Sequence, residues 1–388
     1  MATEEQISQA EQRFGQLIRE DLKRIERMKA SGEPKDYTKL DRIVVGVLPG
    51  DGIGPLIMEQ ALRVLRALVP EELASGKIEL RTIEGMTIER RANLNESLPA
   101  DVLEAAQACD VLIKGPFVTP RAGDPWPNLV SANSLLRRGL DLYAAVRPVR
   151  IPDKGIDWTF FRENIEGEYI WGNKGIQVDD DLAVDFKVQT RQGSERIARA
   201  AFEFAKKNGK HSVTVITKAN IVKLADGNFV QAVERMGEQY PGITVQSRFV
   251  DAMAAKMMDP EFNWGMEVFV LPNLYGDIIT DIAAEHMGGL GMACSSNLGD
   301  HSALFEAIHG TAPNLIAAGL GEYANPCSLI RAAGMLLAHI GYADKNVLLS
   351  KALDRVIADP DAPVAAPGKQ TMGEFTSHLL EVIDELGR

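Results

Sequence analysis

Apolar residues in the first part of this chain recur at helical spacing. Residues 5–29 carry many charges, and among them Ile7, Phe14, Ile18, Leu22, Ile25 and Met28 recur at helical spacing. This spacing predicts an amphipathic helix, which Gly32 and Pro34 should end. The helix could pack on the body of the protein or form a contact in an oligomer, and the sequence leaves both alternatives open.

From Arg42 onward, short apolar runs alternate with helical segments. Residues 42–48 form a nearly continuous apolar run, as expected for a strand buried on both faces. A glycine-rich turn follows, and a helical pattern then covers residues 56–68. Further apolar runs lie at 111–113, 213–216 and 268–271. This alternation predicts an α/β protein built on a sheet.

The overall composition is that of an ordinary globular protein. The chain has 388 residues, of which 45% are hydrophobic and 25% charged, and this length suggests two domains. Its net charge of −12 argues against general binding to nucleic acids or membrane surfaces. Three widely spaced cysteines, Cys109, Cys294 and Cys327, indicate a reducing compartment without a disulfide framework. Because the N-terminus is also too charged for a secretory signal, we expect a cytoplasmic protein.

Two aspartates after the apolar run at 268–271 provide the first chemical signal. Asp277 and Asp281 are four residues apart, so on a helix they share one face. Two carboxylates on one face repel each other unless a cation such as Mg²⁺ or Mn²⁺ lies between them. Alternatively, Asp277 caps the helix and Asp281 is solvated. Spacing alone leaves both interpretations open.

Arginines concentrate in one part of this acidic chain. Residues 137–150 contain four arginines and no lysine, and Arg162 follows shortly. Because the arginine fork suits carboxylates, this cluster indicates binding of a small polyanionic acid. Surface salt bridges are the alternative explanation.

Two loops rich in small residues are weaker signals. Residues 48–55 connect a strand to a helix but do not match the dinucleotide fingerprint, and a tight turn explains them equally well. Residues 307–314 contain a single histidine, His309, which could be purely structural. The sequence also lacks a nucleophile elbow, a phosphate-binding P-loop and a zinc-like histidine cluster.

Taken together, these segments resemble the isocitrate and isopropylmalate dehydrogenase family from about Ile43 to Phe375. The motifs that carry the resemblance are LPGDGIGP, IKGP, SANSLLRRGLDLYAAVRPVR, FRENIEGEY, TKANIVKLADGNF, NLYGDIITD and HGTAPN. The resemblance implies two α/β domains with the active site in the cleft between them, and it implies a fold other than the standard Rossmann fold. It also implies a helical extension at 1–40, a large cofactor-side domain at 41–142 and 288–388, and a small domain at 143–287 with a dimer-forming clasp segment.

The resemblance also assigns roles to individual residues. The implied acid–base pair is Tyr169 and Lys218, and the implied metal ligands are Asp251, Asp277 and Asp281. The implied substrate-binding residues are Ser131, Asn133, Arg137, Arg147, Arg162 and Asn220. The implied cofactor contacts are Ile53, Thr119, His309, Gly310, Thr311, Ala312, Asn314 and Asn325. Members of the family are dimeric or larger, so we expect a homo-oligomer in which Lys218 and Asp251 enter the site from the neighbouring subunit.

These assignments make chemical sense for the oxidative decarboxylation of a 2-hydroxy acid. A metal ion bound to the 2-hydroxyl and its carboxylate lowers the pKa of the hydroxyl. Lys218 or a metal aspartate can then accept the proton as hydride leaves for the nicotinamide. The resulting 2-oxo acid loses its β-carboxylate as CO₂, and Tyr169 would protonate the carbon.

The segment before the first arginine indicates the substrate. Ser131 and Asn133 lie six and four residues before Arg137, where the isocitrate members of the family have a serine and an asparagine. Both side chains can hydrogen-bond a third carboxylate, whereas an alkyl group would leave them unpaired. We therefore predict a small tricarboxylate substrate, namely isocitrate, and a role in the tricarboxylic acid cycle. Homoisocitrate, 3-isopropylmalate and D-malate are the alternatives, and the loop at 119–131 looks longer than in the common bacterial isocitrate enzymes.

The cofactor and the enzyme class follow from the remaining residues. NADP users of the family place Lys-Tyr where this chain has Asn314-Leu315, and a further Tyr and Arg are missing from 361–368. Without these groups a 2′-phosphate would be poorly held, so we predict NAD rather than NADP, together with Mg²⁺ or Mn²⁺. The alternative from another class is a non-catalytic regulatory subunit. Such subunits lose parts of the acid–base and metal set, which this chain keeps.

Overall fold

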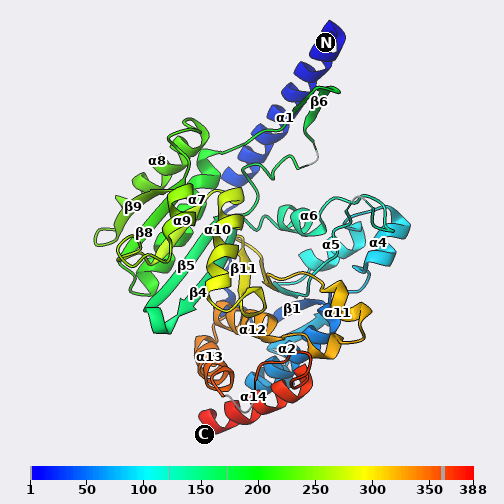
Figure 1. Cartoon of the computed structure of the whole chain (residues 1–388), viewed down its shortest axis with the longest axis vertical. Helices are drawn as coiled ribbons and strands as arrows, with labels where there is room; N and C mark the ends of the chain where they lie inside the picture. Colours follow the sequence, from blue (N-terminus) through cyan, green and yellow to red (C-terminus); the bar gives the residue numbers. More distant parts are fainter. Residues whose placement is uncertain (1, 122, 173, 360–362) are drawn as a thin grey trace. The chain divides into compact units, whose positions relative to one another are not determined.

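The computed structural model describes residues 2–121, 123–172, 174–359 and 363–388. It confirms the α/β architecture and divides into two compact units (Figure 1). The first unit contains residues 1–34 and 143–283, and the second contains residues 35–142 and 284–388. Residues 1–34 thus group with the middle of the chain, whereas residues 35–40 group with the second unit. Of the segments singled out from sequence, residue 122 in the loop at 119–131 and residues 361–362 lie outside the described residues.

Five strands form the sheet of the second unit. In spatial order they are β2 (Ile78–Thr82), β1 (Ile43–Leu48), β3 (Val111–Lys114), β12 (Ala303–Ala307) and β11 (Cys294–Leu298). Neighbouring strands are parallel, except for the antiparallel pair β11–β12. The two apolar runs predicted as strands in this unit, at 42–48 and 111–113, are therefore confirmed as β1 and β3.

Both faces of this sheet are covered, which explains the uninterrupted apolar run of β1. Val45 and Val47 belong to the larger core cluster, whereas Leu48 belongs to the cluster on the other face. The larger cluster is built with the helices α2 (Gly54–Leu68), α12 (Cys327–His339), α13 (Ala343–Ile357) and α14 (Met372–Gly387). The smaller cluster includes side chains of α5 (Ala100–Gln107) and α6 (Ala132–Gly139). The remaining helical segments of this unit are η1 (Tyr37–Lys39), α3 (Pro70–Ala74), α4 (Ile88–Leu94), η3 (Leu290–Met292), α11 (Pro313–Ala317) and η4 (Gly321–Tyr323).

Five strands of the first unit pair side by side. In spatial order they are β4 (Ala144–Ile151), β5 (Ile156–Glu163), β10 (Val268–Leu271), β8 (Ser212–Thr217) and β9 (Thr244–Phe249). The β4–β5 pair is an antiparallel hairpin closed by η2 (Pro152–Lys154), and the other neighbours are parallel. The helices are α7 (Arg191–Lys207), α8 (Ala225–Gly237), α9 (Val250–Lys256) and α10 (Asn273–His286), of which α10 reaches past residue 283. Since α9 and α10 directly follow parallel strands, their first turns lie at the carboxyl edge of this sheet, where ligands bind in open α/β sheets.

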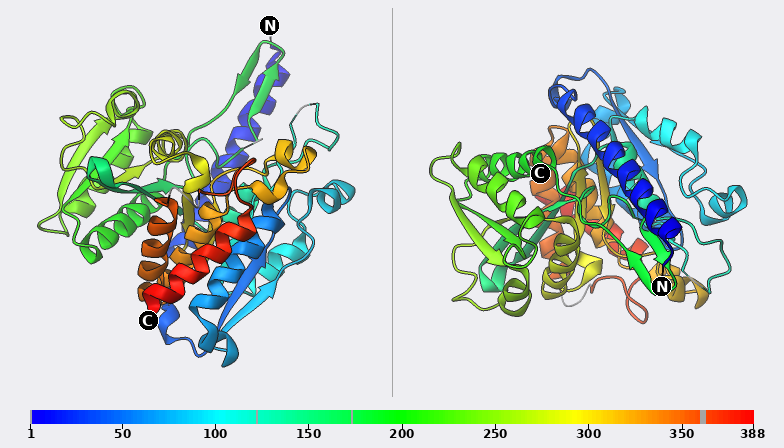
Figure 2. Two further views of the ribbon diagram at one scale, coloured as in Figure 1. Left: turned by 60° about the horizontal axis from the view of Figure 1, so that its bottom comes forward. Right: turned by 90° about the horizontal axis from the view of Figure 1, so that it is seen from above.

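The predicted N-terminal helix is confirmed as α1 (Glu4–Lys29), which a Thr3–Gln6 capping box starts. One side of α1 lies along the two-stranded sheet of β6 (Ile176–Asp179) and β7 (Leu182–Val184), as Figure 2 shows. Leu17 is fully buried beside Trp171, and the ring of Phe14 stacks on that of Phe186 with centroids 5.1 Å apart. Of the two alternatives for this helix, packing on the rest of its own chain therefore holds for this side of α1. Its apolar residues at positions 7, 14, 18 and 22 remain at least 40% exposed.

Candidate active site

Asp277 and Asp281 lie on consecutive turns of α10. The helix begins at Asn273, so Asp277 is in its second turn and does not cap it, which rules out the capping alternative. The side chains of Asp277 and Asp281 are 38% and 54% exposed. Gly276 is needed just before them, because a Cβ at this position would lie 2.5 Å from Cγ of Arg162.

Two predicted substrate arginines bind these aspartates. Arg147 on β4 places Nη1 3.0 Å from Oδ1 of Asp281 and also donates to the Thr280 hydroxyl at 2.5 Å. Arg162 on β5 donates through Nη1 to Oδ1 of Asp277. Two arginines and two carboxylates therefore balance each other at the carboxyl edge of the sheet, and both arginines are nearly buried.

Tyr169 joins the same group. Its hydroxyl donates to Oδ2 of Asp277 at 3.0 Å, and the Arg162 guanidinium lies 5.6 Å from the centroid of its ring. Burial, together with the negative charge of Asp277, raises the pKa of Tyr169 to about 12. The phenol is therefore protonated at neutral pH and can act as a proton donor.

Lys218 and Asp251 form a second charged pair in the same unit. Lys218 directly follows β8, and Asp251 lies in the first turn of α9 after the neighbouring strand β9. Nζ of Lys218 is 2.7 Å from Oδ1 of Asp251, whose side chain is 65% exposed. The hydrogen bond from Lys218 lowers the pKa of Asp251. Asn220, two residues beyond Lys218, is exposed.

The acidic residues of one chain provide only part of a metal site. Within the described ranges, no three His, Cys, Asp or Glu side chains come together as metal ligands. Asp277 and Asp281 nevertheless offer two carboxylates one turn apart, and Asp251 offers a third that is largely exposed. Oxygen-only donors of this kind fit Mg²⁺ or Mn²⁺, provided that further ligands come from outside this pair.

Helix α6 in the second unit carries the residues predicted to select the substrate. Ser131 is the N-cap, and its hydroxyl accepts a hydrogen bond from Ser134 N at 3.4 Å. Oδ1 of Asn133 is buried, and no hydrogen-bond partner is found for it in the described part of the chain. Nη2 of Arg137 lies 2.9 Å from Oε1 of Glu306. An amide oxygen buried without a partner is costly, so Asn133 is suited to a ligand that donates a hydrogen bond to this oxygen, whereas a carboxylate would be bound through its Nδ2.

Sequence reasoning missed Glu306 and Lys114, which hold Arg137 in place. Glu306 on β12 accepts hydrogen bonds from Arg137 and from Asn297 at 2.7 Å, and it pairs with Nζ of the buried Lys114 at 2.8 Å. Although burial alone would raise the pKa of Glu306, the two cations hold it well below its ordinary value. The sequence did contain a signal for this pair. Lys114 and Glu306 each lie in an otherwise apolar strand, β3 and β12, and a charge buried in such a strand must be paired.

The low pKa of Glu306 predicts a pH-dependent contribution to stability. Because the folded-state pKa lies below the ordinary 4.5, the carboxylate stabilises the fold above about pH 4.5, and this contribution disappears as the pH falls further. Glu306→Gln should therefore cost about 3–5 kcal/mol near pH 7, the usual loss when one partner of a buried ion pair is removed. The difference in unfolding free energy from the wild type should narrow below pH 4.5 in denaturant titrations. A pH-independent difference would contradict this prediction.

The two loops rich in small residues lie against each other in the second unit. Ile53 N donates to the Thr311 carbonyl at 3.1 Å, and a Cβ at Gly52 would lie 2.3 Å from that same oxygen. Gly52 also has a φ of +61°, so this turn requires glycine. The adjacent Ala312 has a φ of +48°, which a ligand-binding loop often shows.

The other predicted cofactor residues surround this loop pair with different degrees of exposure. Nε2 of His309 is buried without a hydrogen-bond partner among the described residues, and burial lowers the pKa of His309. Thr119, Gly310 and Asn314 are exposed. Oδ1 of Asn325, two residues before α12 begins at Cys327, accepts from Cys327 N at 2.9 Å. A neutral histidine and exposed loop groups suit an uncharged part of a ligand. The carboxamide oxygen of Asn325, in contrast, already accepts a hydrogen bond from the backbone.

Asp51, in the turn before α2, was another residue missed from sequence. Its buried carboxylate accepts hydrogen bonds from Ile88 N, Val118 N and Nη2 of Arg91, all at 2.8 Å. Arg91 is fully buried. Asp51 thus ties the glycine-rich turn to the start of the loop that contains Thr119.

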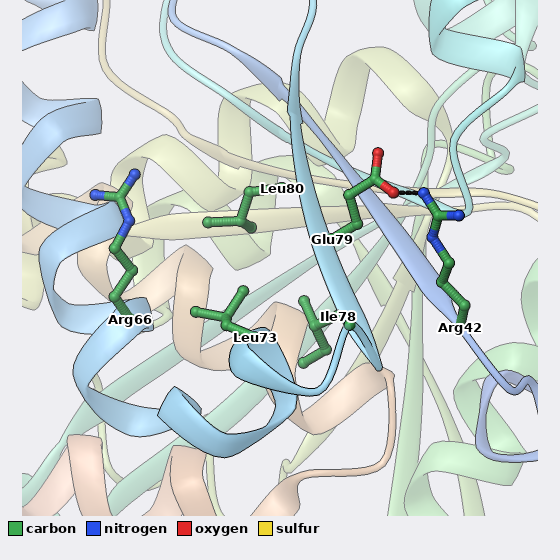
Figure 3. A pocket seen from close by; sticks show the side chains of 7 residues that line it. Arg42, Arg66, Leu73, Ile78, Glu79 and Leu80 are labelled. Carbon is green, nitrogen blue, oxygen red and sulfur yellow. Dashed lines mark ion pairs between the residues drawn. The ribbon is translucent and has the colours of Figure 1, made fainter.

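A depression of about 670 Å³ lies beside the edge strand β2 (Figure 3). Its lining comprises Arg42, Arg66, Leu73, Gly76, Ile78, Glu79 and Leu80. Arg42 and Glu79 form an ion pair. No residue predicted for catalysis, metal or cofactor binding lines it, so it is not the candidate active site.

Comparison with known proteins is consistent with these features. The family model described as isocitrate/isopropylmalate dehydrogenase matches residues 44–371. The mitochondrial NAD isocitrate dehydrogenase subunit 2 of Schizosaccharomyces pombe is 35% identical over 87% of this chain and 86% of its own length. The NADP isocitrate dehydrogenase of Rickettsia prowazekii is also 35% identical, over 80% of this chain and 62% of its own. Identity therefore does not separate the two cofactors.

Other relatives leave the substrate and the catalytic status equally open. The homoisocitrate dehydrogenase of Methanocaldococcus jannaschii is 34% identical, over 80% of this chain and 88% of its own. A regulatory subunit of NAD isocitrate dehydrogenase from Dictyostelium discoideum is 35% identical, over 88% and 92%. The crystal structure of isocitrate dehydrogenase from Methylococcus capsulatus superposes with a TM-score of 0.76 at 33% identity, over 88% of this chain and 99% of that one.

Proposed function

Because this chain belongs to the isocitrate/isopropylmalate dehydrogenase family, we propose that it oxidises and decarboxylates isocitrate to 2-oxoglutarate and CO₂ with reduction of NAD. The observation that carries the proposal is the group formed by Arg147, Arg162, Tyr169, Asp277 and Asp281 at the carboxyl edge of one sheet. It combines carboxylate-binding forks, a protonated phenol and a pair of hard oxygen ligands. These are the parts that oxidative decarboxylation of a 2-hydroxy acid requires.

The arginines are suited to hold the substrate carboxylates. Arg147 and Arg162 are almost buried and are each fixed by a second hydrogen bond, to Thr280 and Asn273 respectively. Fixed guanidinium forks bind carboxylates in defined orientations. On the second unit, Arg137 is held by Glu306 for the same purpose, and Ser131 and Asn133 would hydrogen-bond the third carboxylate.

The acid and the base are assigned from their surroundings. Tyr169 holds its proton firmly and would deliver it to the carbon that loses CO₂. Lys218 would accept the proton of the substrate hydroxyl as hydride leaves for NAD. Asp277 and Asp281, with Asp251 from a second copy of the chain, would hold Mg²⁺ or Mn²⁺, which when bound makes the hydroxyl more acidic and stabilises enolate charge.

The preference for NAD rests on the missing cations near the cofactor loop. Asn314 and Leu315 follow the turn at Ala312, so no charged side chain from this pair could bind a 2′-phosphate. Asn314 is exposed and polar, which suits the hydroxyls of an unphosphorylated ribose.

The cytoplasmic location expected from the sequence stays a prediction, since the S. pombe relative is mitochondrial. Among the described residues no helix is long and apolar enough to cross a bilayer.

A steady-state panel tests the proposal. The purified full chain should be assayed with isocitrate, homoisocitrate, 3-isopropylmalate and D-malate, each with NAD and with NADP, in the presence of Mn²⁺. The highest kcat/KM is expected for isocitrate with NAD. A preference for another acid or for NADP would overturn that part of the assignment. A folded protein without any turnover would favour the regulatory-subunit alternative.

Asn133 should control the choice among these acids. In Asn133→Leu, a carboxylate of isocitrate would face an apolar side chain, and kcat/KM for isocitrate should fall by roughly 10- to 100-fold. The value for 3-isopropylmalate should rise, because its alkyl group no longer leaves the amide unpaired. Ser134→Ala, one residue further along α6, is the matched control and should leave both values nearly unchanged. Equal losses for both substrates would refute a role in specificity.

A further inference from the structure

The carboxylate of Glu166 is completely buried at the N-terminus of α7. It accepts hydrogen bonds from Thr190 N at 2.8 Å, from the Thr190 hydroxyl at 2.5 Å and from Gln189 Nε2 at 3.2 Å. Gly193 makes room for it, because a Cβ there would lie 2.4 Å from the carboxyl group. A helix N-terminus favours an anion, so the fold is built around a charged Glu166.

The cation that pairs with Glu166 comes from the N-terminal helix. Nη2 of Arg24 on α1 donates to Oε1 of Glu166, and the Arg24 side chain is only 16% exposed. Asp21 on α1 and Glu163 at the end of β5 also face this carboxylate, and Arg196 on α7 acts on Glu163. Two glutamates thus lie buried side by side. Burial, with the charge of Glu166, raises the pKa of Glu163 to about 8.

A chain of hydrogen bonds connects Glu166 to the candidate active site. Its backbone carbonyl accepts from Nδ2 of Asn273 at 3.0 Å, and Oδ1 of Asn273 in turn accepts from Nη2 of Arg162 at 2.7 Å. Arg162 then donates to Asp277, which accepts from Tyr169. Glu166 is also only three residues before Tyr169. Its position therefore affects both ends of the Arg162–Asp277–Tyr169 group.

We propose that Arg24 is a positioning residue, through which the N-terminal helix fixes the segment 163–169 and thereby the placement of Arg162 and Tyr169. The proposal rests on the proposed function for the roles of Arg162 and Tyr169. Without Arg24, the buried Glu166 loses the cation that pairs with it directly. The carboxyl group must then move toward water or take up a proton, and either change shifts the segment that carries Tyr169.

Arg24→Met tests the proposal against a matched control on the same helix. Small displacements of positioned groups are costly, so kcat should fall by roughly 10- to 100-fold in Arg24→Met. Glu20→Gln is the control. It removes an exposed ion pair in which Oε2 of Glu20 on α1 lies 2.7 Å from Nζ of Lys174, and it should leave kcat unchanged. Arg24→Lys keeps the charge and should recover part of the rate. A kcat in Arg24→Met equal to that of Glu20→Gln would overturn the proposal.

A double variant separates positioning through Glu166 from general packing. The double variant Arg24→Met/Glu166→Gln should be about as active as Glu166→Gln alone, because the unpaired charge is gone. If Arg24→Met does not fold, comparing the double variant with Glu166→Gln still tests whether Arg24 acts through Glu166. A double variant whose loss is the product of the two single losses would show that Arg24 does not act through Glu166.

Hydrogen exchange provides a readout that does not depend on the substrate. Backbone amides of residues 163–169 should exchange faster in Arg24→Met than in the wild type or in Glu20→Gln. If the wild type turns over none of the four acids, the proposed function fails, while the exchange measurement still tests the role of Arg24. Unchanged exchange in this segment would overturn the role of Arg24.

Discussion

Lys218→Met should lower kcat on isocitrate by roughly 10²- to 10⁴-fold, the usual loss when a catalytic acid or base is removed. Methionine resembles the apolar stem of lysine in length and flexibility, and the change removes the ammonium group. Since Lys218 is partly exposed and its known ionic partner, Asp251, is on the surface, the fold should tolerate the change. The substrate KM should change much less than kcat, because we propose that the arginines hold the carboxylates.

Lys223→Met is the matched control for this variant, because Lys223 is an exposed lysine five residues further along the same segment. It should keep nearly the full rate. A Lys218→Met enzyme that keeps about half of its activity would exclude Lys218 as the base.

Mixing two inactive variants tests the expectation that Lys218 reaches the site of a neighbouring subunit. Tyr169→Phe and Lys218→Met proteins should be unfolded together and refolded. If each site combines Tyr169 of one chain with Lys218 of the other, hybrid dimers contain one intact site and one doubly altered site. About a quarter of the wild-type activity should then return at a 1:1 ratio. No recovery would place both residues in the site of the same chain.

Asp51→Asn should destabilise the protein by about 3–5 kcal/mol, because it leaves the Arg91 guanidinium buried without its carboxylate. Asparagine has nearly the same size, so the loss does not come from a cavity. The same change should raise the KM for NAD, since Asp51 ties the turn at Gly52, which packs on Thr311, to Val118. Denaturant titration measures the first effect, and initial rates at saturating isocitrate measure the second.

Asp101→Asn is the control for Asp51→Asn. It removes an exposed ion pair with Arg90, the residue next to Arg91 in the chain. Exposed pairs contribute little, so its unfolding curve should stay close to that of the wild type. A loss in Asp51→Asn no larger than in Asp101→Asn would show that Arg91 finds another partner or reaches water.

Much of the fold could be predicted because local patterns carry it. The run at 42–48 is apolar throughout because β1 is covered by one core cluster on each face, and the same holds for β3. The helix at the N-terminus follows from spacing and is observed over 26 residues. The hairpin of β4 and β5 was not predicted, because its strands carry Arg147 and Arg162 and therefore do not show a simple apolar pattern. Both strands are nevertheless largely buried, and the two arginines are buried with them.

The candidate site likewise has features that the sequence predicted and features that only the structure revealed. Residue types and motif order in the sequence by itself determined the family and its set of acids, arginines, tyrosine and lysine. Only the tertiary structure decided their partners: Asp277 pairs with Arg162 instead of capping its helix, Glu306 joins Lys114 to Arg137, and Arg24 reaches Glu166 from 142 residues away. The physical reason is that helical and strand patterns arise between near neighbours in the chain. An ion pair between distant residues depends on how the whole unit packs and on which charges that packing removes from water.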